Sequence, residues 1–512
     1  MARRFPGVLV LLSVLAVSCS LSKFAFTECE LNTECRDAFG WGYVCTDSLC
    51  SPVRPLARCS KTYPSDLLQS PGDYQDRHVI GILFDQETFG ALSQVAEFAM
   101  EEVLDQTGLG DDHFGVVVCD NATSSRYDTL NQDDANERVS EYLADEIGAV
   151  AIIGPATSDR AERAFRKVEP FGTLVMSPSA TSPVLTDIDG TTSSYTDPGL
   201  FWRTSPPDDL QGRTLAEVMN ADGVANAAVI FEQGNYGTYL GQKIQSDARQ
   251  EYDIEVVLKP YDGDSLEDLT TKIKQVEGDA EADPQVPTLD VDAVVFISTQ
   301  EEHTKKFLRT VTERDSDSGH TCDSPSICPF RDGGARIYLA DGAKDEANFN
   351  DVSGVERIVD RIKGTSPATA DDDVYAAFVD TLDAEYGDGF ADSRSFTAHS
   401  YDAAWLIIYG AAWSYYNEAQ VTGLGIARGL RQISKKGSGE SITVGRNAWT
   451  TVRAKFAERT PIDVRGASGD LDYDSTSGET SAEIDVWCVD MEDGTGTFGL
   501  YDFEDEECVL TD

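Results

Sequence analysis

Small hydroxyl side chains gather in two short segments of the chain, residues 157–158 and 177–182. Each segment follows an apolar run, residues 149–153 and 173–176, that is typical of a strand buried on both faces of a parallel sheet. Between them, residues 159–169 carry apolar side chains at helical spacing. Open α/β sheets bind ligands at the carboxyl ends of such strands. The two segments therefore predict a site for a small molecule.

The elements that position this site alternate between strand and helix over most of the chain. Residues 79–84 and 114–119 read as earlier strands, and a second series of strands and helices runs from 227 to 340. Alternation of this kind predicts βαβ units and parallel sheets. The strand count fits two doubly wound lobes better than one open sheet. We therefore predict an α/β protein with two Rossmann-like lobes.

Three segments, GPATS at 154–158, SPSATSP at 177–183 and LTD at 185–187, carry a resemblance to a known family, and YDAA at 401–404 adds to it. They resemble the leucine/isoleucine/valine-binding branch of the type I periplasmic binding proteins, which shares its fold with receptor ligand-binding domains of the natriuretic-peptide (ANF) receptor type. The resemblance covers about residues 77–490. It implies two lobes joined by a hinge, with lobe 1 formed by residues 77–204 and 366–460 and lobe 2 by residues 205–357 and 461–512.

The resemblance also implies which residues hold the ligand in lobe 1. Family members that bind amino acids grip the α-carboxylate from one lobe, and this places Ser158 in the first carboxylate turn and Ser179, Ala180 and Thr181 in the second. Backbone N–H groups at a helix start and two hydroxyls make an anion site without a buried cation. The alternative is that Ser158 caps its helix and Thr181 caps a turn. Asp159 would oppose a carboxylate if it pointed inward.

Lobe 2 is expected to hold the other end of the ligand. The resemblance places Tyr236 against the α-carbon region and Asp341, at a strand end, opposite the ammonium group. Local packing of the tyrosine and an ordinary Asp-Gly turn are the alternatives. Thr299 stands where relatives often carry an aromatic wall, which indicates a roomier or more polar pocket and puts a branched aliphatic ligand in doubt.

The implied function is capture of an amino acid or similar small polar solute by hinge closure, with delivery to an ABC permease. The alternative is a sensor or surface interaction protein that keeps the fold with a degenerate pocket. A membrane sensor would then replace the permease as partner.

Other chemistries lack a supporting pattern. GxGxxG at 494–499 has only thirteen residues after it, so no βαβ unit can follow. Asp470, Asp472 and Asp474 resemble half a calcium loop, but Ser475 replaces the required glycine and Ser481 the bidentate glutamate. With 41 Lys and Arg against 90 Asp and Glu, the net charge of −49 disfavours nucleic acid. We expect no enzyme, no metal and no cofactor.

The start of the chain resembles a lipoprotein signal. Two arginines precede the apolar residues 8–17, and Ala-Val-Ser-Cys at 16–19 resembles a lipobox. This implies a signal peptide over residues 1–18 and Cys19 as a lipid anchor, with ordinary secretion as the alternative. We therefore expect an extracytoplasmic protein, in the periplasm or at the outer membrane, attached to the membrane only through this lipid.

The remaining ten cysteines are an even number in a chain expected to reach an oxidising compartment, so disulfides are predicted. Four of them crowd into residues 29–50 of the segment 20–59, which predicts a small disulfide-rich module there, and residues 60–76 read as a linker. Connectivity inside the module stays open. The cysteines of the module are Cys29, Cys35, Cys45 and Cys50, and the pairs predicted outside it are Cys59–Cys119, Cys322–Cys328 and Cys488–Cys508.

Overall fold

The computed structural model describes residues 28–510, apart from 107–108, 110–112, 125, 191–195, 278–290, 317–328, 332–333, 371–372, 434–436, 438, 475–476, 481 and 493–494. The predicted signal peptide, the Cys19 anchor and the Cys322–Cys328 pair lie outside the described residues. Within them, no helix has both the length and the apolar character needed to cross a bilayer.

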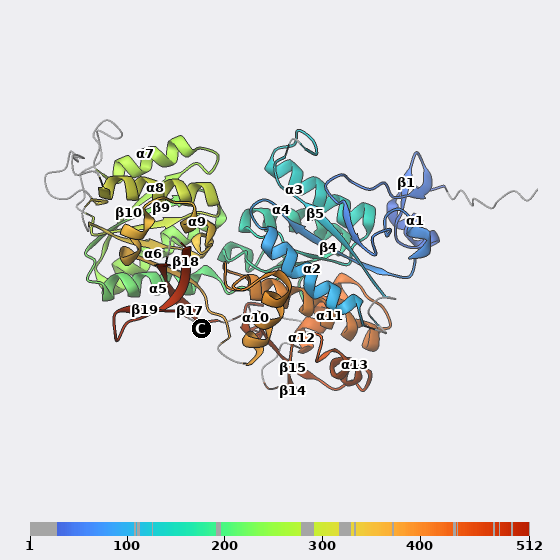
Figure 1. The fold of residues 1–512 in the computed structure, drawn as a ribbon. Helices are drawn as coiled ribbons and strands as arrows, with labels where there is room; N and C mark the ends of the chain where they lie inside the picture. Colours follow the sequence, from blue (N-terminus) through green and yellow to red (C-terminus); the bar gives the residue numbers. More distant parts are fainter. Residues whose placement is uncertain are drawn as a thin grey trace, which may run out of the picture.

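Lobe 1 is built on a six-stranded sheet with helices on both faces, at the right of Figure 1. Its strands, in sheet order, are β3 (Lys61–Tyr63), β5 (Phe114–Asp120), β4 (His78–Phe84), β6 (Ala151–Ile153), β7 (Leu174–Ser177) and β8 (Phe201–Arg203). All pair in parallel except β3, which runs antiparallel to β5 at the edge. One face packs on α2 (Gly90–Leu104) and α11 (Thr397–Glu418), the other on α3 (Gln132–Glu141) and α4 (Ser158–Val168).

Lobe 2 is built on an eight-stranded sheet, at the left of Figure 1. In sheet order its strands are β10 (Glu255–Tyr261), β9 (Asn226–Glu232), β11 (Ala293–Ile297), β12 (Arg336–Leu339), β13 (Ile362–Pro367), β17 (Ile484–Glu492), β18 (Thr495–Asp502) and β19 (Glu507–Leu510). The first five are parallel and the last three add on antiparallel. One face packs on α5 (Asp208–Ala221) and α6 (Asn235–Tyr252), the other on α7 (Leu266–Val276) and α8 (Glu301–Ser316). The predicted α/β fold with two doubly wound lobes is confirmed.

The chain passes between the lobes three times. It leaves lobe 1 after β8, returns after β13 to α10 (Asp373–Tyr386), and leaves again between β16 (Gly469–Asp470) and β17. Buried hydrogen bonds hold these crossings, including Thr204 Oγ1 to the His399 carbonyl at 2.9 Å and Gln211 Nε2 to the Thr365 carbonyl at 3.0 Å. These crossings connect the two lobes.

Two expected boundaries differ from the structure. Residues 60–76 are more than a linker, because β3 lies in the lobe 1 sheet. Residues 461–473 belong with lobe 1 rather than lobe 2. There β15 (Ile462–Gly466) joins a separate three-stranded sheet with β14 (Glu440–Thr443) and β16, and its apolar side chains pack in the core around α11. Strand β3 has three residues with one buried side chain, which is too short to leave a periodic pattern. The alternating burial of β15 indicates a strand but does not tell which lobe the strand joins.

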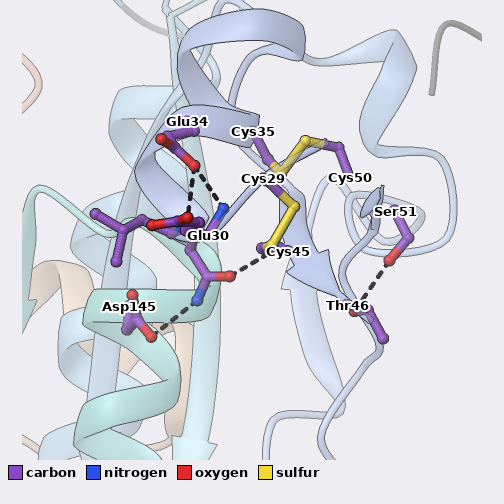
Figure 2. The surroundings of a disulfide bond; sticks show 11 residues. Cys29, Glu30, Glu34, Cys35, Cys45, Thr46, Cys50, Ser51 and Asp145 are labelled. Atoms are coloured by element: carbon purple, nitrogen blue, oxygen red, sulfur yellow. Dashed lines mark hydrogen bonds between the residues drawn. A yellow bond between two sulfur atoms is a disulfide. The ribbon is translucent and has the colours of Figure 1, made fainter. Parts of the chain in front are cut away.

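The predicted disulfide-rich module is confirmed, and Figure 2 shows its two disulfides, Cys29–Cys45 and Cys35–Cys50. Cys35–Cys50 joins α1 (Asn32–Phe39) to β2 (Leu49–Pro52), and Cys29–Cys45 joins the segment before α1 to β1 (Tyr43–Thr46), which pairs with β2 as a hairpin. The module rests on lobe 1, where Asn32 Nδ2 donates to Asp145 Oδ2 at 2.8 Å. The predicted pairs Cys59–Cys119 and Cys488–Cys508 are also confirmed.

Candidate functional site

A hollow of about 650 Å³, including its open mouth, lies between the two lobes, and the centre of a water molecule can reach about 60 Å³ of it. That inner space holds roughly four to six waters, so in this conformation the hollow suits a small solute. Lobe 1 lines it with Thr88, Phe89, Leu92, Ala156, Thr157, Ser158, Ser179, Arg394, Ser395 and Phe396, and lobe 2 with Tyr236, Thr299, Glu301, Asp341, Gly342, Lys344, Asp345 and Asn348.

Ser158 and Ser179 bring the two hydroxyl-rich turns together on the lobe 1 wall. Ser158 is the first residue of α4 and does not cap it; its Oγ instead accepts a hydrogen bond from the Ser182 N–H at 3.2 Å. In the described part of the chain its own proton has no acceptor, so the hydroxyl can donate to a bound oxygen. Ser179 Oγ donates to the Ala156 carbonyl at 2.9 Å, which ties the second turn to the first. Both turns lie at the start of α4, whose N–H groups favour an anion.

Ala180 and Thr181 are not among the lining residues of the hollow. Arg203, which is fully buried, donates to the carbonyls of Ala180 and Ser182 at 3.0 and 2.8 Å. Its other N–H groups reach Thr186 Oγ1 at 3.0 Å and both carboxylate oxygens of Glu479 at 2.6 Å. All five donors of Arg203 are therefore used. The two that bind the carbonyls of Ala180 and Ser182 fix the backbone of the second turn.

Tyr236 and Asp341 face the same hollow from lobe 2. The Tyr236 hydroxyl donates to Asp341 Oδ1, and both side chains are buried. Burial raises the pKa of Asp341 to about 6, against the opposing effect of the Tyr236 hydroxyl. Thr299 also lines the hollow, and Glu232 Oε2 accepts from its N–H at 3.1 Å and holds it in place.

Asp208, the first residue of α5, is a candidate functional residue that the sequence did not reveal. Neither of its carboxylate oxygens makes a hydrogen bond of standard geometry in the described residues, although the nearby Thr181 hydroxyl acts to lower its pKa. Burial and the charge of Asp341 raise the pKa of Asp208. Neither carboxylate forms an ion pair within the described part of the chain. Asp341 lines the hollow and Asp208 does not, so it is the Asp341 carboxylate that can meet a cation there.

Asn235, at the start of α6, connects the lobes beside the hollow. Its N–H donates to the two carboxylate oxygens of Asp159 at 3.1 and 3.0 Å, and its Nδ2 to Glu162 Oε2 at 2.7 Å. Its carbonyl accepts from Ser182 Oγ at 2.9 Å. Gly234 has φ +146°, and a Cβ there would lie 2.7 Å from Asp159 Oδ2. Asp159 therefore points across to lobe 2 rather than into the site, and the lobes are closed on each other.

Possible metal ligands gather elsewhere. Among the residues that the structure describes, the one group of three that lies within 4.8 Å is Cys29, Cys35 and Cys50. All three sulfurs are held in disulfides, and a metal ligand would have to be a thiolate. This group offers no metal site.

Comparison with known proteins supports the resemblance drawn from the sequence. A family model described as the receptor family ligand binding region (ANF receptor) matches residues 91–490. No curated protein sequence matches the chain significantly.

Similar solved structures include substrate-binding and solute-binding proteins of transporters. LivJ of Streptococcus pneumoniae, the branched-chain amino acid transporter protein solved with isoleucine, is 16% identical with a TM-score of 0.57, over 82% of this chain and 97% of that one. The leucine binding protein LivK of Thermotoga maritima is 15% identical with a TM-score of 0.59, over the same shares. A solute binding protein of R. palustris solved with benzoate is 14% identical with a TM-score of 0.56, over 82% and 95%. At these identities the likeness concerns the fold.

Proposed function

Because the chain belongs to the receptor-family ligand-binding-region family, whose match spans most of both lobes, we propose that it captures an amino acid or similar small polar solute between its lobes. The observation that carries this proposal is the shared hollow: Ser158 at the start of α4 faces it from one lobe, and the buried Tyr236–Asp341 pair from the other. Such an arrangement offers hydrogen-bond donors to a carboxylate and a negative charge to an ammonium group.

Binding proceeds by hinge closure. The solute's carboxylate is held by Ser158 and the N–H groups of α4, and closure brings Asp341 and Tyr236 onto its ammonium group. Only contacts absent from the open state can drive closure. Asn235 provides such contacts between the lobes, and the ammonium group, once beside the buried Asp341, provides another.

The expected partner is an ABC permease, and the expected location is outside the cytoplasm, with the chain held at the membrane through a lipid on Cys19. The similarity to the ABC-transporter solute binding protein of R. palustris and the four disulfides of the described residues support this assignment. A membrane sensor in place of the permease is the second candidate, supported by the disulfide module, which lies outside the matched residues. Mass spectrometry of the native chain tests the anchor: an acyl mass on Cys19 that Cys19→Ser removes would support it, and an unmodified Cys19 in the membrane fraction would exclude it.

Identification of the solute tests the function itself. Native protein would be purified without added ligand, unfolded, and its released small molecules identified by mass spectrometry; the stripped protein would then be titrated with each candidate by calorimetry. Micromolar or tighter binding that Asp341→Asn weakens is expected. A protein that retains nothing and shows neither heat nor a thermal shift with any amino acid or small carboxylate would instead fit the rival reading, an interaction protein with a degenerate pocket.

A further inference from the structure

The lobe 2 wall of the hollow extends from Asp341 to Asn348, and its far part is polar. Gly342, Lys344 and Asp345 line the hollow between these two residues. With the ammonium group at Asp341, the side chain of a bound amino acid would extend along this wall. The groups that meet it there decide which side chain is preferred.

Arg394 faces this part of the wall from lobe 1. Its Nη1 donates to the Thr88 carbonyl at 2.8 Å, and its Nη2 pairs with Asp345 of lobe 2. A guanidinium has five N–H donors, so three have no acceptor among the described residues. An isolated antiparallel β-bridge between Asp345 and Arg394 holds together the two segments that carry them. Arg394 is thus a rigidly held group with donors to spare at a solute-sized hollow.

The charges around these donors have partners within the protein. Asp345 neutralises Arg394, and each side chain is 17% exposed. Lys344, the other cation of this wall, interacts with Asp392 and Asp485, and its Nζ lies 5.8 Å from the centroid of the Phe498 ring. Glu301, another lining residue, pairs with Lys305. A carboxylate on the solute would bring a third negative charge beside Asp345 and Glu301. An aliphatic side chain would leave the Arg394 donors without water or a partner, which is unfavourable for buried donors. A neutral oxygen acceptor avoids both penalties.

Asn348 supplies the complementary group. It is 1% exposed, its Nδ2 donates to the Ala343 carbonyl at 3.0 Å, and its Oδ1 has no hydrogen-bond partner in the described residues. An unpartnered acceptor on the lobe 2 wall and free donors on the lobe 1 wall match a group that both accepts and donates. A side-chain amide does this with its carbonyl oxygen and its NH₂ group.

We propose that Arg394 and Asn348 form a side-chain subsite that selects amino acids with a neutral amide, of the asparagine and glutamine class. The inference rests on the proposed function, since it takes the solute to be an amino acid with its ammonium group at Asp341. The inner space of roughly four to six waters favours the shorter members of that class.

Calorimetric titration of the stripped full chain with asparagine, glutamine, leucine and glutamate tests the subsite. The better amide should bind at least tenfold more tightly than leucine or glutamate, as one hydrogen bond to a charged donor requires. Arg394→Met should bring the ratio of amide to leucine affinity towards one, whereas Arg394→Lys, which keeps the charge and some donors, should retain part of it. The ratio is the readout because loss of the Asp345 pair weakens closure for every solute alike.

If Arg394→Met does not fold, Asn348→Leu gives the same comparison from the opposite wall. Tighter binding of leucine or glutamate than of both amides, or an unchanged ratio in these variants, would overturn the subsite and leave the proposed function standing. Absence of binding by all four amino acids would overturn both.

Discussion

Asp341 makes solute affinity depend on pH, and the sign follows from its burial. In the solute-free protein burial raises the pKa of Asp341 to about 6. An ammonium group beside the carboxylate favours its ionised form, so the bound complex has a lower pKa than the free protein. Binding therefore releases a proton where the free carboxyl is protonated, and affinity falls as pH drops below about 6.

The magnitude comes from the difference between the two pKa values. Each pH unit below the free pKa weakens binding by up to tenfold while the bound carboxylate stays ionised, or about 1.4 kcal/mol. Between pH 7.5 and pH 4 the dissociation constant should rise by about a hundredfold. Asp208, whose pKa is also raised by burial and by Asp341, would steepen the dependence if both carboxylates ionise on binding.

Calorimetry at several pH values, each in two buffers of different ionisation enthalpy, measures both affinity and proton release. Above pH 7 we expect little change, and near pH 5 the release of close to one proton per solute. Asp341→Asn should bind more weakly at pH 7.5 and lose most of the dependence. Affinity that is constant from pH 7.5 to pH 4.5, or an Asn variant with the full wild-type slope, would show that Asp341 does not meet the ammonium group.

Three further substitutions test the surrounding structure. Ser158→Ala removes a donor to the solute's carboxylate, so calorimetry should show affinity reduced by about tenfold to a hundredfold; unchanged affinity would remove Ser158 from the site. Arg203→Lys keeps the charge but loses the guanidinium N–H groups that bind the carbonyls of the second turn. We expect about tenfold weaker solute binding with a near-native melting curve. Replacing Cys59 and Cys119 by alanine opens a crosslink between residues 60 apart in sequence, which lowers the free energy of unfolding by about 4 kcal/mol. Denaturant titration measures that loss, and solute affinity should persist because neither cysteine lines the hollow.

The framework of the fold could be predicted from the sequence because strands buried on both faces leave continuous apolar runs. Residues 79–84, 149–153 and 173–176 are such runs, and β4, β6 and β7 lie on them within one or two residues. Strand β3 left no such signal, since its three residues Lys-Thr-Tyr include one buried side chain. Its place in the sheet depends on pairing with β5 and on the nearby Cys59–Cys119 disulfide, which are contacts distant in sequence.

The site residues that could be predicted are those at strand ends and helix starts, because these positions place a side chain at the ligand-binding edge of the sheet. Ser158, Ser179, Tyr236 and Asp341 follow strand ends or begin helices, and all four reach the hollow. For Thr181, however, the direction of the turn depends on a residue distant in sequence. Arg203 binds the carbonyls on either side of Thr181, and Thr181 does not line the hollow.

Asp208 and Arg394 carried no sequence signal for a different reason. An acidic residue in the first turn of a helix is favoured by the helix dipole alone, so Asp208 looks like ordinary helix chemistry. Arg394 lies in a polar loop, and its value to the site comes from Thr88 and Asp345, which are far from it in the sequence. The role of Asp208 or Arg394 can be recognised only once the structure brings together residues that are distant in the sequence.

The α4 terminus shows how one helix end can serve both closure and binding. An anion at a helix N-terminus is stabilised whether it belongs to the protein or to the solute, and Asp159 could have competed for that position. Its carboxylate instead accepts the N–H of Asn235 at the start of α6, so it lies between two helix N-termini and links the lobes. Ser158, one residue earlier, is left to face the hollow. Because the Asn235 contacts join one lobe directly to the other, part of the free energy of closure belongs to the protein itself. The solute then needs to supply only the difference between the open and closed states, and its ammonium group does so in part by neutralising the buried charge of Asp341.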